Sequence, residues 1–175
     1  MRRLAAILLF ILFSLSQLSA QEIADYLKTP KGITDKMLEL ISGDIDEARD
    51  WEAYRNLFLP TAQKIIRNPN AQQISQQVRA MNLEEFVRYV GPQYKKYGFE
   101  EVSIGTTVNE FNGIAQVFQS FHAKNLTGTY EKRGINSYQL VFASGRWWIA
   151  STCWADETEE QKIPAKYLDD SAKNE

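Results

Sequence analysis

Shortly after residue 30, apolar side chains recur at the spacing of one helical face. Met37, Leu38 and Ile41 form this stripe, because residues three and four positions apart share a face of an α-helix. Thr34 is a residue type that caps helix N-termini, so the pattern predicts a helix that begins there. Residues 21–32 contain a proline and a glycine without this period, and they predict a flexible lead-in.

A second helix is expected from residue 46 to residue 58. Trp51, Tyr54 and Phe58 fall at i, i+3 and i+7, on one face of this helix. The proline at position 60 then ends the element.

A third helix is expected to begin at Asn82. Glu85 follows three residues later and completes a capping-box pattern. Phe86 and Val90 supply its apolar face. The Gly91-Pro92 pair is expected to kink or interrupt it, because proline removes a backbone donor and clashes with the preceding turn.

The rest of the chain alternates apolar and polar positions, which is the period of β-strands. Strands are predicted at residues 62–67, 73–79, 102–111, 114–124, 135–142 and 146–154. Asn112-Gly113 predicts a tight type I′ turn between two of them. Helices followed by a meander of antiparallel strands indicate an α+β fold rather than an α/β fold.

The first twenty residues have the three-part layout of a secretory signal peptide. Arg2 and Arg3 precede an unbroken apolar run over residues 4–13, and a more polar stretch ends at Ala20. We therefore expect residues 1–20 to be removed and the protein to be exported, to the periplasm or the medium. The apolar run is short for an uncleaved anchor, so no membrane association is expected after cleavage.

Charge and composition exclude several classes of partner. The chain has 20 basic and 22 acidic residues, and cleavage would move its net charge from −2 to −4 because two arginines leave. Such a balance argues against a nucleic-acid partner, which would require a basic surface. A single His and a single Cys exclude a disulfide framework and histidine- or cysteine-rich metal centres, so no metal and no cofactor is expected.

Several short segments together resemble the nuclear transport factor 2-like (SnoaL-like) superfamily, and more narrowly an exported bacterial group without an assigned activity. They are Asp50-Trp51, Tyr54, Leu57-Phe58, 60–62, 134–137, 145–149 and Trp154. The resemblance covers residues 33–168 and leaves residues 169–175 as a polar tail. It implies a cone: a strongly curved antiparallel sheet wrapped around three N-terminal helices, with a pocket between them. Superfamily members include isomerases, hydrolases, cyclases, dehydratases, transport adaptors and binding domains, so the fold does not fix the function.

Two residues are candidates for acid–base catalysis. Asp50 adjoins an indole, and in a cavity such a carboxylate would have a raised pKa. A structural role for Asp50, in contact with a backbone group or an arginine, is the favoured alternative. His122 is the only imidazole and could act as a general base, although a half-exposed histidine at a strand end is the simpler interpretation.

Four residues are candidates for ligand binding. Alternation places Asn136 and Tyr138 on one face of a strand, where an amide and a phenol could orient a ligand, or could complete hydrogen bonds within the sheet. Trp51 and Tyr54 would add aromatic surface from the second helix. The expected ligand is a small apolar or aromatic molecule.

Strict alternation along the last strand divides its aromatic residues between two faces. Trp147, Ile149 and Cys153 would share one face, with Cys153 as a small buried hydrophobe, and Trp148 and Trp154 would share the other. Indole rings on the outer face of the sheet would form an exposed apolar patch unless another part of the protein or a second copy buried them. A homodimer through the convex face of the sheet, as the resemblance implies, would bury them; residues 163–168 of the same chain are the alternative.

These observations favour an exported, non-enzymatic protein that binds a small molecule or acts as a scaffold. The alternative is a cofactor-independent lyase, isomerase or hydrolase that uses a pocket carboxylate or His122 as its base. The first is preferred because spacing alone assembles no acid–base pair.

Overall fold

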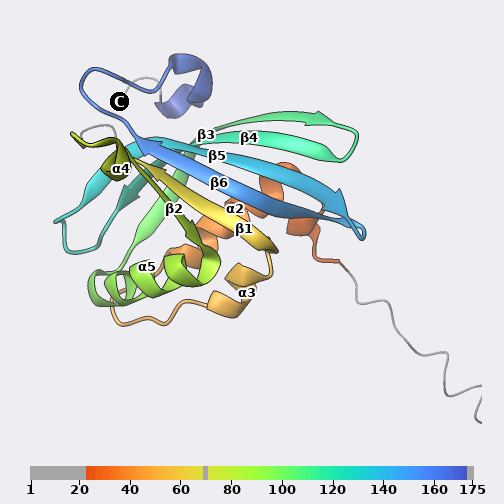
Figure 1. The fold of residues 1–175 in the computed structure, drawn as a ribbon, viewed down its shortest axis with the longest axis horizontal. Helices are drawn as coiled ribbons and strands as arrows, with labels where there is room; N and C mark the ends of the chain where they lie inside the picture. Colours follow the sequence, from red (N-terminus) through yellow and green to blue (C-terminus); the bar gives the residue numbers. More distant parts are fainter. Residues whose placement is uncertain (1–22, 69–70, 173–175) are drawn as a thin grey trace, which may run out of the picture.

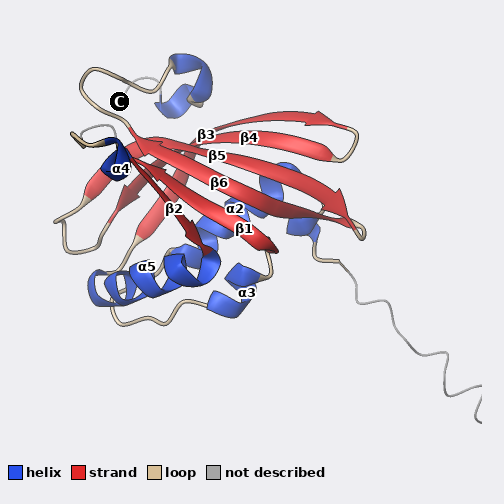
Figure 2. Cartoon of the chain, in the orientation of Figure 1, coloured by secondary structure: helices blue, strands red, loops and turns tan. Residues whose placement is uncertain are grey.

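The computed structural model describes residues 23–68 and 71–172 as one six-stranded curved sheet with helices against its inner face (Figures 1 and 2). The strands are β1 (Phe58–Arg67), β2 (Val78–Asn82), β3 (Glu100–Phe111), β4 (Ile114–Lys124), β5 (Glu131–Ala143) and β6 (Arg146–Asp156). Their order is β2-β1-β6-β5-β4-β3, and each neighbouring pair is antiparallel except β1 with β6. The predicted α+β fold with a curved sheet is confirmed. The predicted signal peptide lies outside the described residues.

Three helices lie on the inner, concave face of the sheet. They are α2 (Pro30–Ile41), α3 (Trp51–Arg55) and α5 (Leu83–Tyr97). The short elements are η1 (Asp25–Leu27), α4 (Ile74–Gln77), η2 (Ala165–Tyr167) and η3 (Asp170–Ala172). Within the part of the chain that the structure describes, no helix has the length and apolarity to cross a membrane.

The N-cap of helix α2 lies five residues earlier than predicted. Thr29 is the N-cap: its Oγ1 accepts a hydrogen bond from the Gly32 N–H at 3.0 Å, and Pro30 occupies the first turn. Proline is suited to that position because its missing N–H would have no partner in the helix. Thr34 is instead fully buried inside the helix, so the cap predicted at Thr34 is wrong.

Helix α3 is only a fragment of the predicted 46–58 helix. Arg49 is buried and donates to the carbonyls of Ile41 (3.0 Å), Glu47 (2.9 Å) and Gly43 (2.6 Å), which stabilises an irregular approach to the helix. Phe58 already belongs to β1. The helix-like spacing of Trp51, Tyr54 and Phe58 therefore spans a short helix and the start of a strand.

Helix α5 confirms the predicted capping box. The Glu85 N–H donates to Asn82 Oδ1, and the Asn82 N–H donates to Glu85 Oε2, both at 2.9 Å. The helix continues through Pro92 to Tyr97, so the expected interruption is absent. Before it, the region predicted as a strand at 73–79 is the single turn α4, followed by β2.

Both tight turns of the sheet have the conformation that their residues favour. Asn112 and Gly113 have φ values of 45° and 81°, and Ser144 and Gly145 have values of 53° and 78°. Two consecutive positive φ angles define a type I′ turn, whose twist matches that of the flanking strands. The predicted Asn112-Gly113 turn is confirmed.

A bulge in β6 changes the face on which its last residues lie. Leu140 pairs with Ile149 but Gln139 pairs with Ser151, which leaves one extra residue, Ala150, between them. An extra residue reverses the alternation beyond it. Trp154 therefore lies on the same concave face as Trp147, and Cys153 is exposed. The predicted separation of these tryptophans and the buried Cys153 are both wrong.

The C-terminal segment lies on the convex side of β3 and β4. Ser120 Oγ donates to the Tyr167 carbonyl at 2.8 Å, and the rings of Phe118 and Tyr167 are 5.3 Å apart. A Cβ at Gly105 would approach the Tyr167 carbonyl oxygen to 2.1 Å, so this contact requires glycine. Residues 163–168 thus cover these two strands rather than Trp154, which faces the other way.

Candidate functional site

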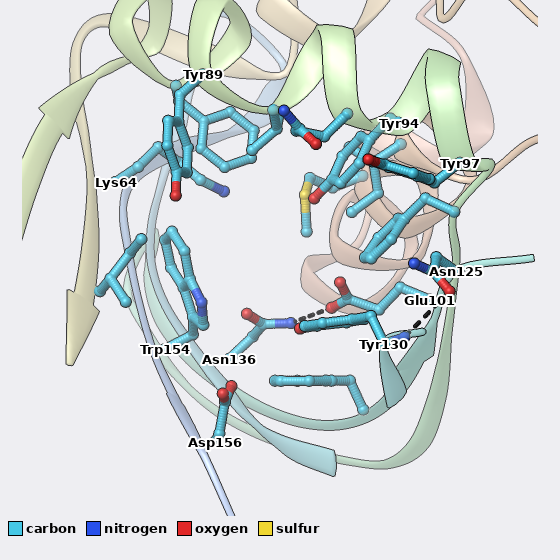
Figure 3. Close-up of a pocket in the computed structure, with 18 of the residues that line it drawn as sticks. Lys64, Tyr89, Tyr94, Tyr97, Glu101, Asn125, Tyr130, Asn136, Trp154 and Asp156 are labelled. Atoms are coloured by element: carbon cyan, nitrogen blue, oxygen red, sulfur yellow. Dashed lines mark hydrogen bonds between the residues drawn. The ribbon is translucent and has the colours of Figure 1, made fainter. Parts of the chain in front are cut away.

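The concave side of the sheet is incompletely filled, and a cavity of about 540 Å³ remains between α5, the end of α2 and the strands (Figure 3). Aromatic side chains dominate its wall: Phe86, Tyr89, Tyr94, Tyr97, Phe99, Phe121, Tyr130 and Trp154. Its polar lining includes Lys64, Gln93, Glu101, Asn125, Asn136 and Asp156. The volume lies within the range of small-molecule sites.

Lys64 of β1 is the most unusual residue of this wall. It is only 3% exposed, and its Nζ lies 4.7 Å from the centre of the Phe86 ring and 5.5 Å from that of Trp154. The rings of Phe58 and Tyr54 follow at 5.3 and 5.8 Å. Among the residues that the structure describes, Lys64 forms no ion pair. Burial lowers its pKa to about 7, and the negative charge of Glu101 only partly opposes this shift.

Glu101 of β3 provides the second ionisable group of the cavity. Its Oε1 accepts a hydrogen bond of 2.7 Å from the Asn136 side-chain amide. Burial raises the pKa of Glu101 to about 7; the Asn136 hydrogen bond and the charge of Lys64 oppose the shift, and Asp156 adds to it. Lys64 and Glu101 therefore both change charge near neutral pH, from opposite sides of one cavity (Figure 3).

Contacts between aromatic rings form much of the rest of the wall. Tyr94 lies 4.1 Å from Phe99 in a parallel stack, and Phe86 meets Trp154 edge to face at 6.1 Å. Burial raises the pKa of Tyr94 well above its ordinary value, so its hydroxyl stays protonated and can donate or accept a hydrogen bond. Flat faces with a few polar groups suit a flat apolar molecule.

Of the four predicted ligand-binding residues, the structure places one at the cavity wall. Asn136 lines the cavity and holds Glu101. Tyr54 lies behind the wall, with its ring near Lys64 and its buried hydroxyl unpaired among the described residues. Trp51 packs on Tyr94 from outside, at 6.4 Å. Tyr138 is fully buried elsewhere in the core.

The two predicted catalytic residues lie away from the cavity. Asp50 is exposed and caps α3, where its Oδ1 accepts from the Ala53 N–H at 2.8 Å. This matches the structural alternative considered from the sequence. His122 lies on the convex side, 2.7 Å from Glu131 Oε1, next to charged surface residues. Neither residue lines the cavity: His122 pairs with Val102, next to Glu101 in the register, but its side chain lies on the other face of the sheet.

Sequence reasoning missed both Lys64 and Glu101. A signal for Lys64 was present in the sequence. Alternation places Lys64 between Ala62 and Ile66 on one face of the strand, so it shares the face of two apolar residues. Glu101 had no comparable signal, since it stands at the start of β3 beside another glutamate. In the described residues, no group of three potential metal ligands is present.

No family model and no curated protein matches the chain. Solved structures do resemble it. A scytalone dehydratase-like protein from Novosphingobium aromaticivorans matches with a TM-score of 0.55 at 10% identity, over 73% of this chain and 81% of the other. The association domain of C. elegans CaMKII matches with a TM-score of 0.52 at 17% identity, over 70% and 88%.

A further match is an NTF2-like protein of unknown function from Silicibacter pomeroyi. Its TM-score is 0.52 at 12% identity, over 73% of this chain and 92% of the other. Identities this low carry the fold and no activity. On the architecture described above and on these matches, the chain has the nuclear transport factor 2-like fold.

Proposed function

We propose that this protein binds a small, mainly apolar or aromatic molecule in the cavity beneath α5. The observation that carries this proposal is a pair of ionisable side chains on an aromatic wall, the buried Lys64 and the half-buried Glu101, without an ion pair between them. Burying such groups costs folding free energy unless a partner compensates. A bound molecule with a polar group would supply that partner.

The lining indicates how such a molecule would lie. Its flat body would contact Trp154 and Tyr94, which face the cavity from opposite walls (Figure 3). Its polar group would lie near Lys64, Glu101 and Asn136, where donors and acceptors are both available. The preferred role is therefore ligand binding, with no reaction required.

Titration of naphthylmethanol, followed by isothermal titration calorimetry, tests this proposal. Trp154→Ala should weaken binding roughly tenfold, since a lost aromatic contact is worth about 1 to 1.5 kcal/mol. Trp148→Ala is the matched control, because Trp148 lies on the convex side with its ring beneath Arg146. Equal weakening by both substitutions, or no saturable binding at all, would contradict a ligand site in this cavity.

A second candidate function is cofactor-independent proton abstraction, as in a lyase, isomerase or hydrolase. It is supported by Glu101, whose raised pKa and cavity position suit a general base better than Asp50 or His122. The test is exchange of the α-protons of an aromatic ketone in D₂O. Exchange that is lost in Glu101→Gln and kept in Asp50→Asn would support it, and exchange no faster than in buffer would exclude this substrate class.

We also propose that two copies associate through the convex face. One row of apolar residues crosses that face: Phe111 and Ile114 are 76% and 59% exposed, and Val141 and Trp148 continue the register on β5 and β6. A related fold serves as an association domain. Ile114→Glu should give a monomer in sedimentation at micromolar concentration, whereas Val102→Glu, at the other end of the face, should not. A wild-type monomer would contradict the homodimer.

Export remains a proposal that rests on the pattern of residues 1–20. N-terminal sequencing of the protein from the periplasm or medium would test it, with Gln21 expected as the first residue. A full-length chain retained in the cells would contradict it.

A further inference from the structure

Lys64 combines a buried amine, an aromatic surround and access to a cavity of ligand size. We propose that Lys64 forms a reversible imine with an aldehyde or ketone bound in this cavity, so that the protein is a carbonyl-compound receptor or the scaffold of an imine-dependent reaction. This inference rests on the proposed binding function and adds the chemical class of the ligand.

The geometry leaves the amine available for bond formation. Lys64 comes from the middle of β1, paired on one side with Thr152 of β6 and on the other with Met81 of β2, so its backbone is fixed. Four aromatic rings surround its Nζ within 6 Å, and no described carboxylate or hydrogen-bond acceptor holds it. Figure 3 shows the amine directed from the wall into the cavity.

The surroundings also keep a useful fraction of the amine neutral. With its pKa lowered to about 7 by burial, a substantial fraction of Lys64 is unprotonated at neutral pH. An ordinary lysine with a pKa near 10.4 has roughly one neutral amine in 2,500 at that pH. Only the neutral amine attacks a carbonyl carbon, so Lys64 has a large advantage over surface lysines.

The reaction is balanced without an oxidant or a reductant. The nitrogen lone pair of Lys64 attacks the carbonyl carbon, and a proton moves from nitrogen to oxygen to give a carbinolamine. Glu101, protonated in part near pH 7, lies across the cavity and is the group suited to donate the proton with which the oxygen leaves as water. As the water leaves, the nitrogen lone pair forms the C=N bond of an iminium ion, and the nitrogen then returns its proton to the Glu101 carboxylate to give the imine. Hydrolysis reverses the sequence.

An alternative role for Lys64 is to pair with an anionic ligand. Three matched probes separate the two roles: naphthaldehyde, naphthylmethanol and naphthoate, which share one apolar body and differ in the polar group. Each is titrated against the full mature chain by isothermal titration calorimetry. The aldehyde is then incubated with cyanoborohydride at pH 7, which reduces an imine to a stable secondary amine, and modified lysines are mapped by mass spectrometry.

We expect the adduct on Lys64 to form roughly tenfold or more faster than on any other lysine. Lys64→Arg keeps the positive charge but has no nucleophilic amine, so it should lose this adduct. Lys96→Arg is the matched control, because Lys96 lies 4.7 Å from the Tyr97 ring but is exposed, and it should label like the wild type. Unfolding in urea checks that each variant is folded. If Lys64→Arg fails to fold, Lys64→Met replaces it.

A second measurement is the pH dependence of labelling. The rate at Lys64 should level off above about pH 7, whereas surface lysines should react faster up to about pH 10. The titratable groups that face Lys64 are Glu101 and Asp156 from the sheet and Tyr54 and Tyr94 from the helices. Burial raises the pKa of Glu101 to about 7, the same range as Lys64, so the profile is compared in Glu101→Gln.

Each other outcome overturns a defined part of the proposal. If naphthylmethanol binds but the adduct is spread over surface lysines, the imine is wrong and ligand binding stands. If naphthoate binds far more tightly than naphthylmethanol and Lys64 is not labelled, Lys64 is an anion receptor. If none of the three probes binds, both the proposed function and the imine are wrong for aromatic ligands.

Discussion

The two ends of the concave face differ in whether their buried polar side chains have hydrogen-bond or ion-pair partners. At the closed end, Tyr138 donates to Gln119 Oε1 at 3.1 Å, and the Gln119 amide donates to Asp35 Oδ1 at 2.8 Å, so the polar atoms are linked up to the surface of α2. At the open end, Lys64 lies among rings without an ion pair and faces empty volume. The first arrangement stabilises the fold, and the second destabilises it.

This difference identifies the open end as the functional one. A buried network with satisfied hydrogen bonds needs no ligand to explain it. An uncompensated buried charge is destabilising, and such groups concentrate at sites where binding or chemistry requires them. The comparison can be tested by making the same type of change at both ends.

The largest expected effect comes from matched isoleucine substitutions. Ile149 is fully buried at the closed end, so Ile149→Ala should lower the free energy of unfolding by about 3 to 4 kcal/mol, the cost of a new cavity in a packed core. Ile66 lines the existing cavity, so Ile66→Ala should cost about 1 kcal/mol. Urea denaturation measures both. Equal losses would show that the open end is as closely packed as the closed end.

Removal of the buried charge should stabilise the protein. For Lys64→Met we expect a gain of about 2 to 4 kcal/mol below pH 7. Lys64 has a folded-state pKa of about 7 against its usual 10.5, so the unfolded chain binds the proton more tightly. Wild-type stability is therefore lost as the pH falls from about 10.5 to 7, and the advantage of Lys64→Met should vanish above about pH 10.5.

Urea unfolding from pH 6 to pH 10 measures this trend, with Lys95→Met, an exposed lysine of α5, as the control without effect. A Lys64→Met variant that is less stable than wild type at pH 6 would contradict this prediction. It would mean that contacts at the open end stabilise the charge of Lys64, as the hydrogen bond to Gln119 stabilises the Tyr138 hydroxyl at the closed end.

Much of the fold was predictable because local rules determine it. The capping box at Asn82, the Asn112-Gly113 turn and the strand at 114–124 depend on neighbouring residues, and all three are confirmed. The bulge at Ala150 was not predictable, because nothing in its own segment marks an extra residue. That one residue moves Trp154 into the cavity and Cys153 out to solvent.

The site was less predictable than the fold for the same physical reason. Asn136 could be assigned to the concave face because simple alternation holds along its strand, and its role in ligand binding stays a prediction. Lys64 and Glu101 stand on strands that are far apart in sequence, and they share a cavity only because the sheet curves around α2. His122 and Asp50 were candidates from the sequence because of their side-chain chemistry alone, and the fold places both at the surface.

The smallest expected effect concerns the second ionisable group of the open end. Glu101→Gln should raise the free energy of unfolding by about 1 to 2 kcal/mol above pH 7. The folded-state pKa of Glu101 is about 7 against its usual 4.5, so wild-type stability is lost as the pH rises from about 4.5 to 7, and the variant should show no advantage below pH 4.5. The remaining side-chain carbonyl can still accept from Asn136.

Tyr138→Phe is the matched change at the closed end, and urea unfolding at each pH measures both variants. Tyr138→Phe removes one hydrogen bond to Gln119 and should lower the free energy of unfolding by about 1 kcal/mol. This loss should be independent of pH between 5 and 9, because the substitution changes no charge. Opposite signs for Glu101→Gln and Tyr138→Phe, with pH dependence only in the former, would establish the contrast between the two ends. Two similar pH-independent losses would show instead that Glu101 is a structural member of a satisfied network, and the open end would then need no ligand to explain its charges.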